Sequence, residues 1–193
     1  LCYNDNIDPI SYSFAGGTDQ SQVSIEWSVG GSVVAPPQGI TTTITINSLT
    51  INGNANESLA VDTIYSYEVK AEVAGCSTLD IVETGSITLS ASPSLLIQNP
   101  GTDDQIFCEG NSLTTIEYQL DNGADNVQFQ WTSPNIPNGL TQTLSSGVFS
   151  ISGTPDAQAA TSEYTYQITP VNSITGCAGT PVTGSITVNA LSS

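Results

Sequence analysis

The chain has 193 residues, of which 18 are acidic and one is basic, so its formal net charge is −17. Binding to nucleic acid or to an anionic membrane surface needs clustered lysine and arginine, and this composition excludes both. The apolar runs are too short to cross a bilayer, so we expect no membrane insertion. Hydrophobic residues make up 38% of the chain, which is enough for a packed core.

In chain order, residues 23–27 give the first strand pattern, because Val23, Ile25 and Trp27 alternate with polar residues. Residues 40–46 alternate isoleucine with threonine and predict a strand with one buried face. Residues 65–73 alternate in the same way, and residues 87–89 form a short fourth strand. Clusters of Gly, Asn and Pro separate these segments. Because no stretch has a sustained helical period, we predict an all-β fold.

The same motifs occur twice in the same order, with a period of about 100 residues, which is a typical size for a β-sandwich domain. We therefore predict two tandem immunoglobulin-like sandwiches, residues 1–93 and 94–193, joined at residues 91–94. Residues 95–106 have no counterpart before Cys2, so we expect the first repeat to lack its opening strand and the chain to be cut from a longer array. The matched positions are Cys2 and Cys108, Trp27 and Trp131, 37–40 and 137–140, 51–53 and 151–153, 65–67 and 164–166, 75–76 and 176–177, and 84–89 and 183–188.

The four cysteines include no CxxC pair, which favours disulfides in an oxidising compartment over a zinc site. Three connectivities are open. Pairing Cys2 with Cys76 and Cys108 with Cys177 is the scheme that treats both repeats alike, so we expect one bridge in each repeat. Closing loops of about 70 residues would stabilise each domain by roughly 4 kcal/mol.

The tryptophans and the single lysine each allow two interpretations. Trp27 and Trp131 are either sugar-stacking platforms or core residues, and their equivalent places after alternating apolar residues favour the core. Lys70 could form an isopeptide bond if it were buried, but Glu68 and Glu72 flank it, and we expect an exposed ion pair instead.

Two groups of aspartates suggest a calcium site. Asp121 and Asp125 surround a glycine turn, and Asp103 and Asp104 lie near the joint between the repeats. Hard carboxylate oxygens on a loop suit Ca²⁺, although Asp, Asn and Gly are also ordinary turn residues. We expect no other cofactor.

The composition also argues against an enzyme. Without histidine the chain can form neither a Ser-His-Asp triad nor a Cys-His pair, and no glycine-rich phosphate loop is present. A carboxylate pair could hydrolyse glycosides, but nothing in the sequence singles out such a pair. We therefore expect no enzymatic activity.

The ordered motifs of the second repeat, from residues 108–110 through 136–140, 149–155 and 164–166 to 183–188, resemble the PKD-like and Ig-like repeats of giant Bacteroidetes surface proteins. These proteins include the mobile adhesins of gliding bacteria, exported by the type IX secretion system. The first repeat departs from the pattern, since Gly53 is followed by Asn54 and Ala55 where the second has Thr154 and Pro155.

The resemblance implies an extracellular filament of tandem sandwiches on a bacterial cell surface, with neighbouring repeats of the same chain as partners. Such a segment would be a stalk or spacer for adhesion or gliding, while other parts of the protein contact a surface or polysaccharide. The alternatives are a carbohydrate-binding module and an accessory module of a secreted surface protein.

Overall fold

The computed structural model describes residues 1–14, 18–46, 48–73, 76–157 and 160–190; of residues 18–22, 72, 73 and 76–82 it describes the backbone alone. Within these ranges every regular element is a strand, and the fold is all-β as predicted. The chain divides into two compact units, Leu1–Ala91 and Ser92–Ser193. The division lies inside the linker expected at residues 91–94.

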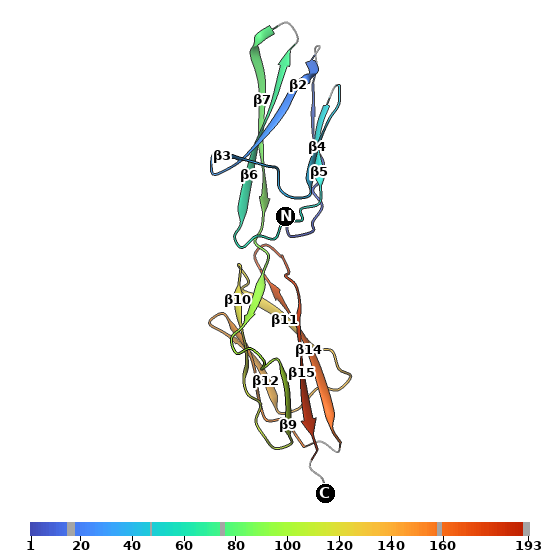
Figure 1. Ribbon diagram of the computed structural model, residues 1–193, viewed down its shortest axis with the longest axis vertical. Coiled ribbons are helices and arrows are strands. Elements are labelled where there is room, and N and C mark those ends of the chain that lie inside the picture. The colour runs from blue at the N-terminus through green and yellow to red at the C-terminus, as the bar shows by residue number, and fades with distance from the viewer. Residues whose placement is uncertain (15–17, 47, 74–75, 158–159, 191–193) are drawn as a thin grey trace. The chain divides into compact units, whose positions relative to one another are not determined.

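The first unit is a sandwich of two antiparallel sheets (Figure 1). One sheet has the order β1-β5-β4, and the other has the order β3-β2-β6-β7. The strands are β1 (Ile10–Ser13), β2 (Thr18–Val29), β3 (Ser32–Val34), β4 (Ile40–Ile44), β5 (Ser48–Gly53), β6 (Thr63–Val73) and β7 (Cys76–Leu89).

The period-two pattern of residues 65–73 becomes the buried face of β6. Tyr65, Tyr67, Val69 and Ala71 are all buried in the core between the two sheets, because alternate side chains of a strand point to the same face. The predicted strand 40–46 is shorter in the structure and ends at Ile44. Ile46 is 69% exposed because the chain turns there towards β5, with the Thr45 amide donating to the Ser48 carbonyl.

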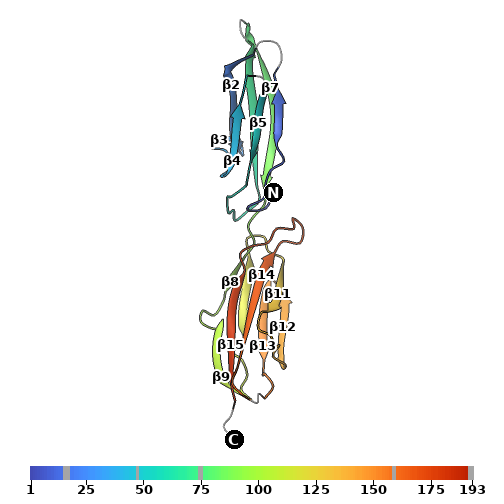
Figure 2. The ribbon, with the colours of Figure 1, turned by 90° about the vertical axis from the view of Figure 1, so that its right-hand side faces the viewer.

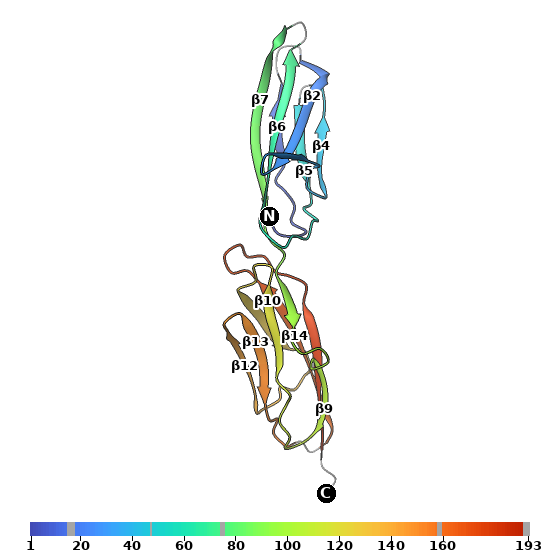
Figure 3. The same ribbon diagram turned by 60° about the vertical axis from the view of Figure 1, so that its left-hand side comes forward.

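The second unit is also a two-layer sandwich, and Figure 3 shows β10, β12 and β13 in one of its layers. Its sheets have the orders β12-β13-β10-β8 and β11-β14-β15-β9. Strand β9 runs parallel to β15, while the other pairs are antiparallel. The strands are β8 (Ser94–Ile97), β9 (Asp104–Cys108), β10 (Ile116–Asp121), β11 (Asn126–Trp131), β12 (Leu140–Ser145), β13 (Val148–Gly153), β14 (Ser162–Val171) and β15 (Val182–Asn189).

Six strands have the same place in both units. They are β1 and β10, β2 and β11, β4 and β12, β5 and β13, β6 and β14, and β7 and β15. The stretch without a counterpart in the first repeat forms two strands, β8 and β9, one at an edge of each sheet. The corresponding edges of the first unit are β1 and β7, next to which no further strand lies among the described residues.

Candidate functional site

A polar lock holds the edge strand β9 onto β15, and Figure 2 shows the two strands alongside each other. The backbone amide and the hydroxyl of Ser185 donate to Oδ1 of Asp104 at 2.9 and 2.8 Å. The same amide also reaches the carbonyl oxygen of Asp103 at 2.9 Å. Hydrogen bonds to a carboxylate are stronger than neutral ones, so the lock fixes both the position and the register of β9.

Tyr166 adds a fourth bond to this lock from inside the sandwich. Its hydroxyl donates to the Asp103 carbonyl at 3.1 Å and lies 3.4 Å from the hydroxyl of Tyr118. Burial, together with the Tyr118 contact and the nearby aspartates, raises the pKa of Tyr166. Gly184 is needed beside it, since a Cβ there would clash with the Tyr166 hydroxyl and the Asp103 carbonyl.

Asp125 ties two loops of the second unit together. Its Oδ1 accepts bonds from the backbone amide of Ser173 at 2.8 Å and from the Ser173 hydroxyl at 2.9 Å. These bonds hold the pKa of Asp125 below its ordinary value. Nearby, the side-chain amide of Asn172 donates to the Gly123 carbonyl at 2.8 Å. The polar groups of this turn therefore bind each other.

The predicted calcium ligands are not brought into one site. Asp103 and Asp104 lie at β15, whereas Asp121 and Asp125 border the turn from β10 to β11. Within the described ranges, no group of three or more His, Cys, Asp or Glu residues could hold a metal ion. Asp104 and Asp125 each use a carboxylate oxygen to bind a serine, a role that the sequence reasoning missed.

The cysteines depart from the predicted scheme of one bridge per repeat. Cys2 and Cys177 are each disulfide-bonded, but Cys108, the expected partner of Cys177, is an exposed free thiol. The predicted bridge from Cys108 to Cys177 is therefore wrong. Cys108 is the last residue of the edge strand β9, where alternate side chains face outwards, and this places its sulfur in solvent. The side chain of Cys76, and with it the predicted bridge from Cys76 to Cys2, lies outside the described residues.

Both tryptophans pack against their cores rather than forming an exposed platform. Trp27 is 3% exposed, with its ring centroid 5.0 Å from that of Tyr67. Trp131 is half-buried and makes edge-to-face contacts with Phe129 at 5.2 Å and Tyr166 at 6.0 Å. The prediction that these residues fill the core is thus confirmed for Trp27, and Trp131 lies at the margin of its core.

The Lys70 side chain is 42% exposed and forms an ion pair with Glu68, the two charged groups being 3.2 Å apart. This agrees with the expected surface pair. The side chain of Glu72, the second expected partner, lies outside the described residues.

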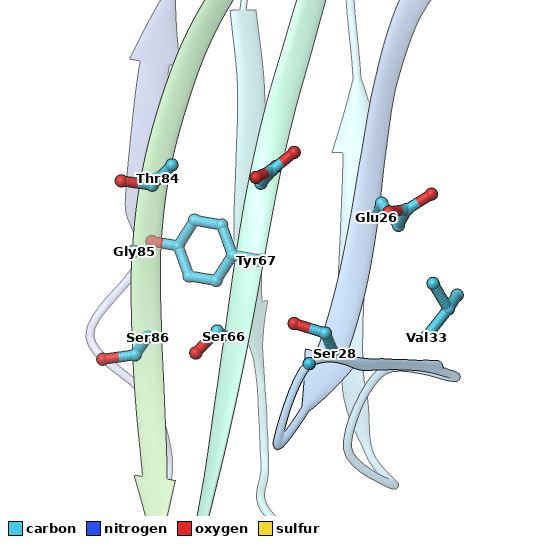
Figure 4. A pocket seen from close by; sticks show the side chains of 10 residues that line it. Glu26, Ser28, Val33, Ser66, Tyr67, Thr84, Gly85 and Ser86 are labelled. Atoms are coloured by element: carbon cyan, nitrogen blue, oxygen red, sulfur yellow. The ribbon is translucent and has the colours of Figure 1, made fainter.

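Two open hollows lie on the part of the first unit that the structure describes. One, of about 520 Å³, lies on the outer face of the β2-β6-β7 sheet, where Glu26, Glu68 and Thr84 contribute polar groups (Figure 4). The other, of about 540 Å³, is lined by Val34, Tyr65 and Glu57 among others. The Tyr65 hydroxyl donates to Glu57 at 2.9 Å, and burial together with this bond raises the pKa of Tyr65 to about 12.

Among the described residues, no helix has the length and apolar character required to cross a membrane. No protein-family model matches the chain, and no curated protein matches it either. The fold itself, by contrast, is found among solved structures.

An I-band fragment of titin matches with a TM-score of 0.53 and 12% identity over 98% of this chain and 61% of the titin chain. A titin structure of three Ig domains with Glu-to-Ala changes matches with a TM-score of 0.53 and 13% identity over the same shares. The present chain thus spans about three fifths of the titin chains. This chain consists of tandem immunoglobulin-like β-sandwich domains. At such low identity the likeness extends to the fold alone.

Proposed function

We propose that this chain is a spacer segment of an extracellular, filamentous cell-surface adhesin, and that it has no enzymatic activity of its own. The observation that carries the proposal is the repetition of one immunoglobulin-like sandwich with a separate hydrophobic core in each copy. A fold that completes its core within each repeat can be strung into arrays and is often used for structural repeats.

Three features of the chain support this role. Cys2 and Cys177 are each disulfide-bonded, and disulfides are suited to an oxidising compartment. The charge of −17 keeps neighbouring filaments apart by repulsion. Within the described ranges some carboxylates and aromatic rings serve strand locking or packing, as Asp104, Tyr166 and Trp27 illustrate.

Single-molecule stretching of the full chain between terminal tags, with reductant present so that no disulfide limits extension, tests the mechanical part of the proposal. A spacer that carries load is expected to give two separate unfolding events, one for each sandwich. Extension without force peaks would contradict the role. Immunolabelling of unpermeabilised producing cells tests the location, and labelling only after permeabilisation would contradict a surface protein.

The second candidate function is carbohydrate binding, favoured by the hollow on the outer sheet face of the first unit. Its lining offers the carboxylates of Glu26 and Glu68 and several hydroxyl groups, which are suitable hydrogen-bond partners for a sugar (Figure 4). A glycan array with the full chain, compared with the Glu26→Ala variant, separates the two functions. Specific binding that the variant loses would favour a binding module, and no binding would favour the spacer.

A further inference from the structure

The hollow on the outer sheet face of the first unit contains two glutamates that lie directly opposite each other. Glu26 of β2 is paired in register with Glu68 of β6, and both residues are exposed. Directly opposite side chains of an antiparallel pair have Cβ atoms about 5 Å apart, so like charges at these positions repel each other. Lys70 forms an ion pair with Glu68 and offsets one of the two charges. Within the described part of the chain Glu26 makes no hydrogen bond or ion pair, so the hollow keeps an excess of negative charge.

The second unit has an amide pair at the same two positions. Tryptophan and tyrosine are paired between β11 and β14 as they are between β2 and β6, so Gln130 and Gln167 are the counterparts of Glu26 and Glu68. The side-chain amide of Gln130 donates to the side-chain oxygen of Gln167 at 2.8 Å. The sandwich can therefore fill these positions with neutral groups that bond each other, and the carboxylate pair is a feature of the first unit alone.

The hydroxyl groups beside the two pairs differ between the units in the same way. Ser28 and Ser66 are paired in register and line the hollow, and their hydroxyls have no hydrogen-bond partner among the described residues. The hydroxyls of their counterparts, Thr132 and Thr165, bond each other at 2.8 Å. Figure 4 shows Ser28 and Ser66 next to each other on neighbouring strands. A hydroxyl without a protein partner can both donate to a ligand and accept from it.

The hollow also has an apolar wall and room for a small ligand. Val33 of β3, which is 68% exposed, lies beside Ser28, and Thr84 of β7 is paired with Glu68 on the other side. The lining thus extends over β2, β6 and β7, and because neighbouring strands are about 4.8 Å apart, it is about 10 Å wide. A matching ligand has a positive group for the carboxylates, hydroxyls for the serines and an apolar surface for Val33.

We propose that this hollow binds an amino sugar, whose protonated amino group lies between the carboxylates of Glu26 and Glu68 while its ring hydroxyls bond Ser28 and Ser66. Hydrogen bonds from an ammonium group to carboxylates are about twice as strong as neutral ones, so the amino group gives the selectivity. The hydroxyls of the lining favour a sugar over a lysine side chain, which would leave Ser28 and Ser66 without a partner. This inference rests on the carbohydrate-binding candidate and names its ligand class, and it is independent of the spacer role.

Two disaccharides that differ in charge test the proposal. One is the β-1,4-linked disaccharide of glucosamine, and the other is the same disaccharide with both amino groups acetylated, which removes their positive charge. Amide chemical shifts of the full chain are followed at about pH 5.5, where amines are protonated and carboxylic acids are ionised in water. Salt at about 0.15 M screens the general attraction of a cation to the acidic chain beyond about 8 Å. We expect the glucosamine disaccharide to shift the amides of residues 26–28 and 66–68 and to bind about ten-fold more tightly than its acetylated form.

Variants of the carboxylates identify the groups that bind the ligand. Glu26→Gln should weaken binding of the glucosamine disaccharide by about ten-fold, because one hydrogen bond to a charged group is lost. The double variant Glu26→Gln with Glu68→Gln should abolish detectable binding, and it should fold because the second unit has glutamine at both counterpart positions. Glu163→Gln is the control, since it removes one exposed charge from a strand of the second unit, and it should bind as the parent chain does.

Four results would overturn the proposal. If neither disaccharide shifts residues 26–28 and 66–68 at about 10 mM, the carbohydrate-binding candidate is wrong as well, whereas the spacer role is tested separately by stretching. Equal binding of the two disaccharides at these residues would leave a sugar site without selection for the amino group. Equal weakening by Glu163→Gln and Glu26→Gln would show only general attraction to the acidic surface. Binding of capped lysine at least as tight as that of the glucosamine disaccharide would assign the hollow to a protein partner.

Discussion

At the scale of single residues, the Tyr166 hydroxyl connects the core of the second unit to its edge strand. Tyr166→Phe removes the bond to the Asp103 carbonyl while the ring still fills the core. Because the carbonyl loses a buried partner, we expect the second unit to lose about 1–2 kcal/mol of unfolding free energy. Urea denaturation of the full chain, followed by signals of this unit, measures the loss.

Tyr164→Phe is the control for this substitution. Tyr164 lies on the same strand and is also buried, at 3% exposure, but it does not take part in the lock on β9. Its replacement should change the free energy of unfolding by less than about 0.5 kcal/mol. Equal losses in the two variants would show that the hydroxyl of Tyr166 is not what holds β9.

Because of Asp125, the unfolding free energy of the second unit should depend on pH in the acid range. Its pKa is lower in the folded chain than in the unfolded chain because Ser173 donates two bonds to the carboxylate. The stabilisation is therefore present above the unfolded pKa of about 3.9 and is lost as the pH falls through the folded value. The unfolding free energy should decrease below about pH 4.

Asp125→Asn isolates this contribution from the other carboxylates. Asparagine keeps an oxygen acceptor for Ser173 but does not titrate, so the stability difference between parent and variant should shrink as the pH falls below about 4. Urea denaturation of both proteins between neutral and strongly acidic pH provides the measurement. A difference that stays constant over this range would contradict the role of the charge.

At the scale of the element, the cysteine at the end of strand β9 and the cysteine in the loop that follows β14 differ in their bonding state. Cys177 is 2% exposed and disulfide-bonded, while Cys108 is exposed and free. Cys177→Ser should lower the unfolding free energy by about 2–5 kcal/mol. Cys108→Ser should change it by less than about 0.5 kcal/mol.

Thermal unfolding with and without reductant checks this contrast. Reductant should lower the melting temperature of the parent chain and of Cys108→Ser, and it should have little further effect on Cys177→Ser. Alkylation of the native, unreduced chain should modify Cys108. A Cys108→Ser variant that loses as much stability as Cys177→Ser would mean that Cys108 is bridged after all.

At the scale of the whole molecule, the two separate cores predict two cooperative units. Ile51 in the first core and Ile151 in the second occupy the same place in their repeats, and both are fully buried. Replacing either by alanine should destabilise its own unit by about 2–5 kcal/mol through lost burial and a residual cavity.

Calorimetry of the full chain and of these two variants measures the effect. We expect the heat capacity trace to contain two transitions, with Ile51→Ala lowering one midpoint and Ile151→Ala lowering the other. If either variant shifted a single transition that includes the whole chain, the two sandwiches would unfold as one unit.

Much of the fold could be read from local patterns. The alternation in residues 65–73 predicted a strand with one buried face because side chains of a strand point to opposite faces in turn. The repeated motifs predicted two sandwiches, since similar sequences bury their apolar residues in similar ways. Ile46 shows the limit of the method: it continues the alternation of residues 40–44, but the chain turns there and leaves its side chain exposed.

The functional assignments depended on contacts between residues that are far apart in the sequence. Asp104 was a candidate calcium ligand because it is a carboxylate near the expected joint between the repeats, yet Ser185, 81 residues away, binds its carboxylate. The Thr-Gly-Ser-Ile-Thr pattern of residues 84–88 and 183–187 was visible as a signal, but the role of its serine in the second repeat required the pairing of β9 with β15.

The sequence alone determined that this protein is an acidic, all-β tandem repeat. The net charge, the alternation of apolar and polar residues and the repeated motifs are properties of the chain itself and do not depend on which distant residues come into contact. Only the tertiary structure decided which cysteines are bonded and which aspartates lock a strand. A disulfide or a hydrogen bond forms between groups within a few ångströms of each other, and that proximity is set by how the sheets pair rather than by the order of residues along the chain.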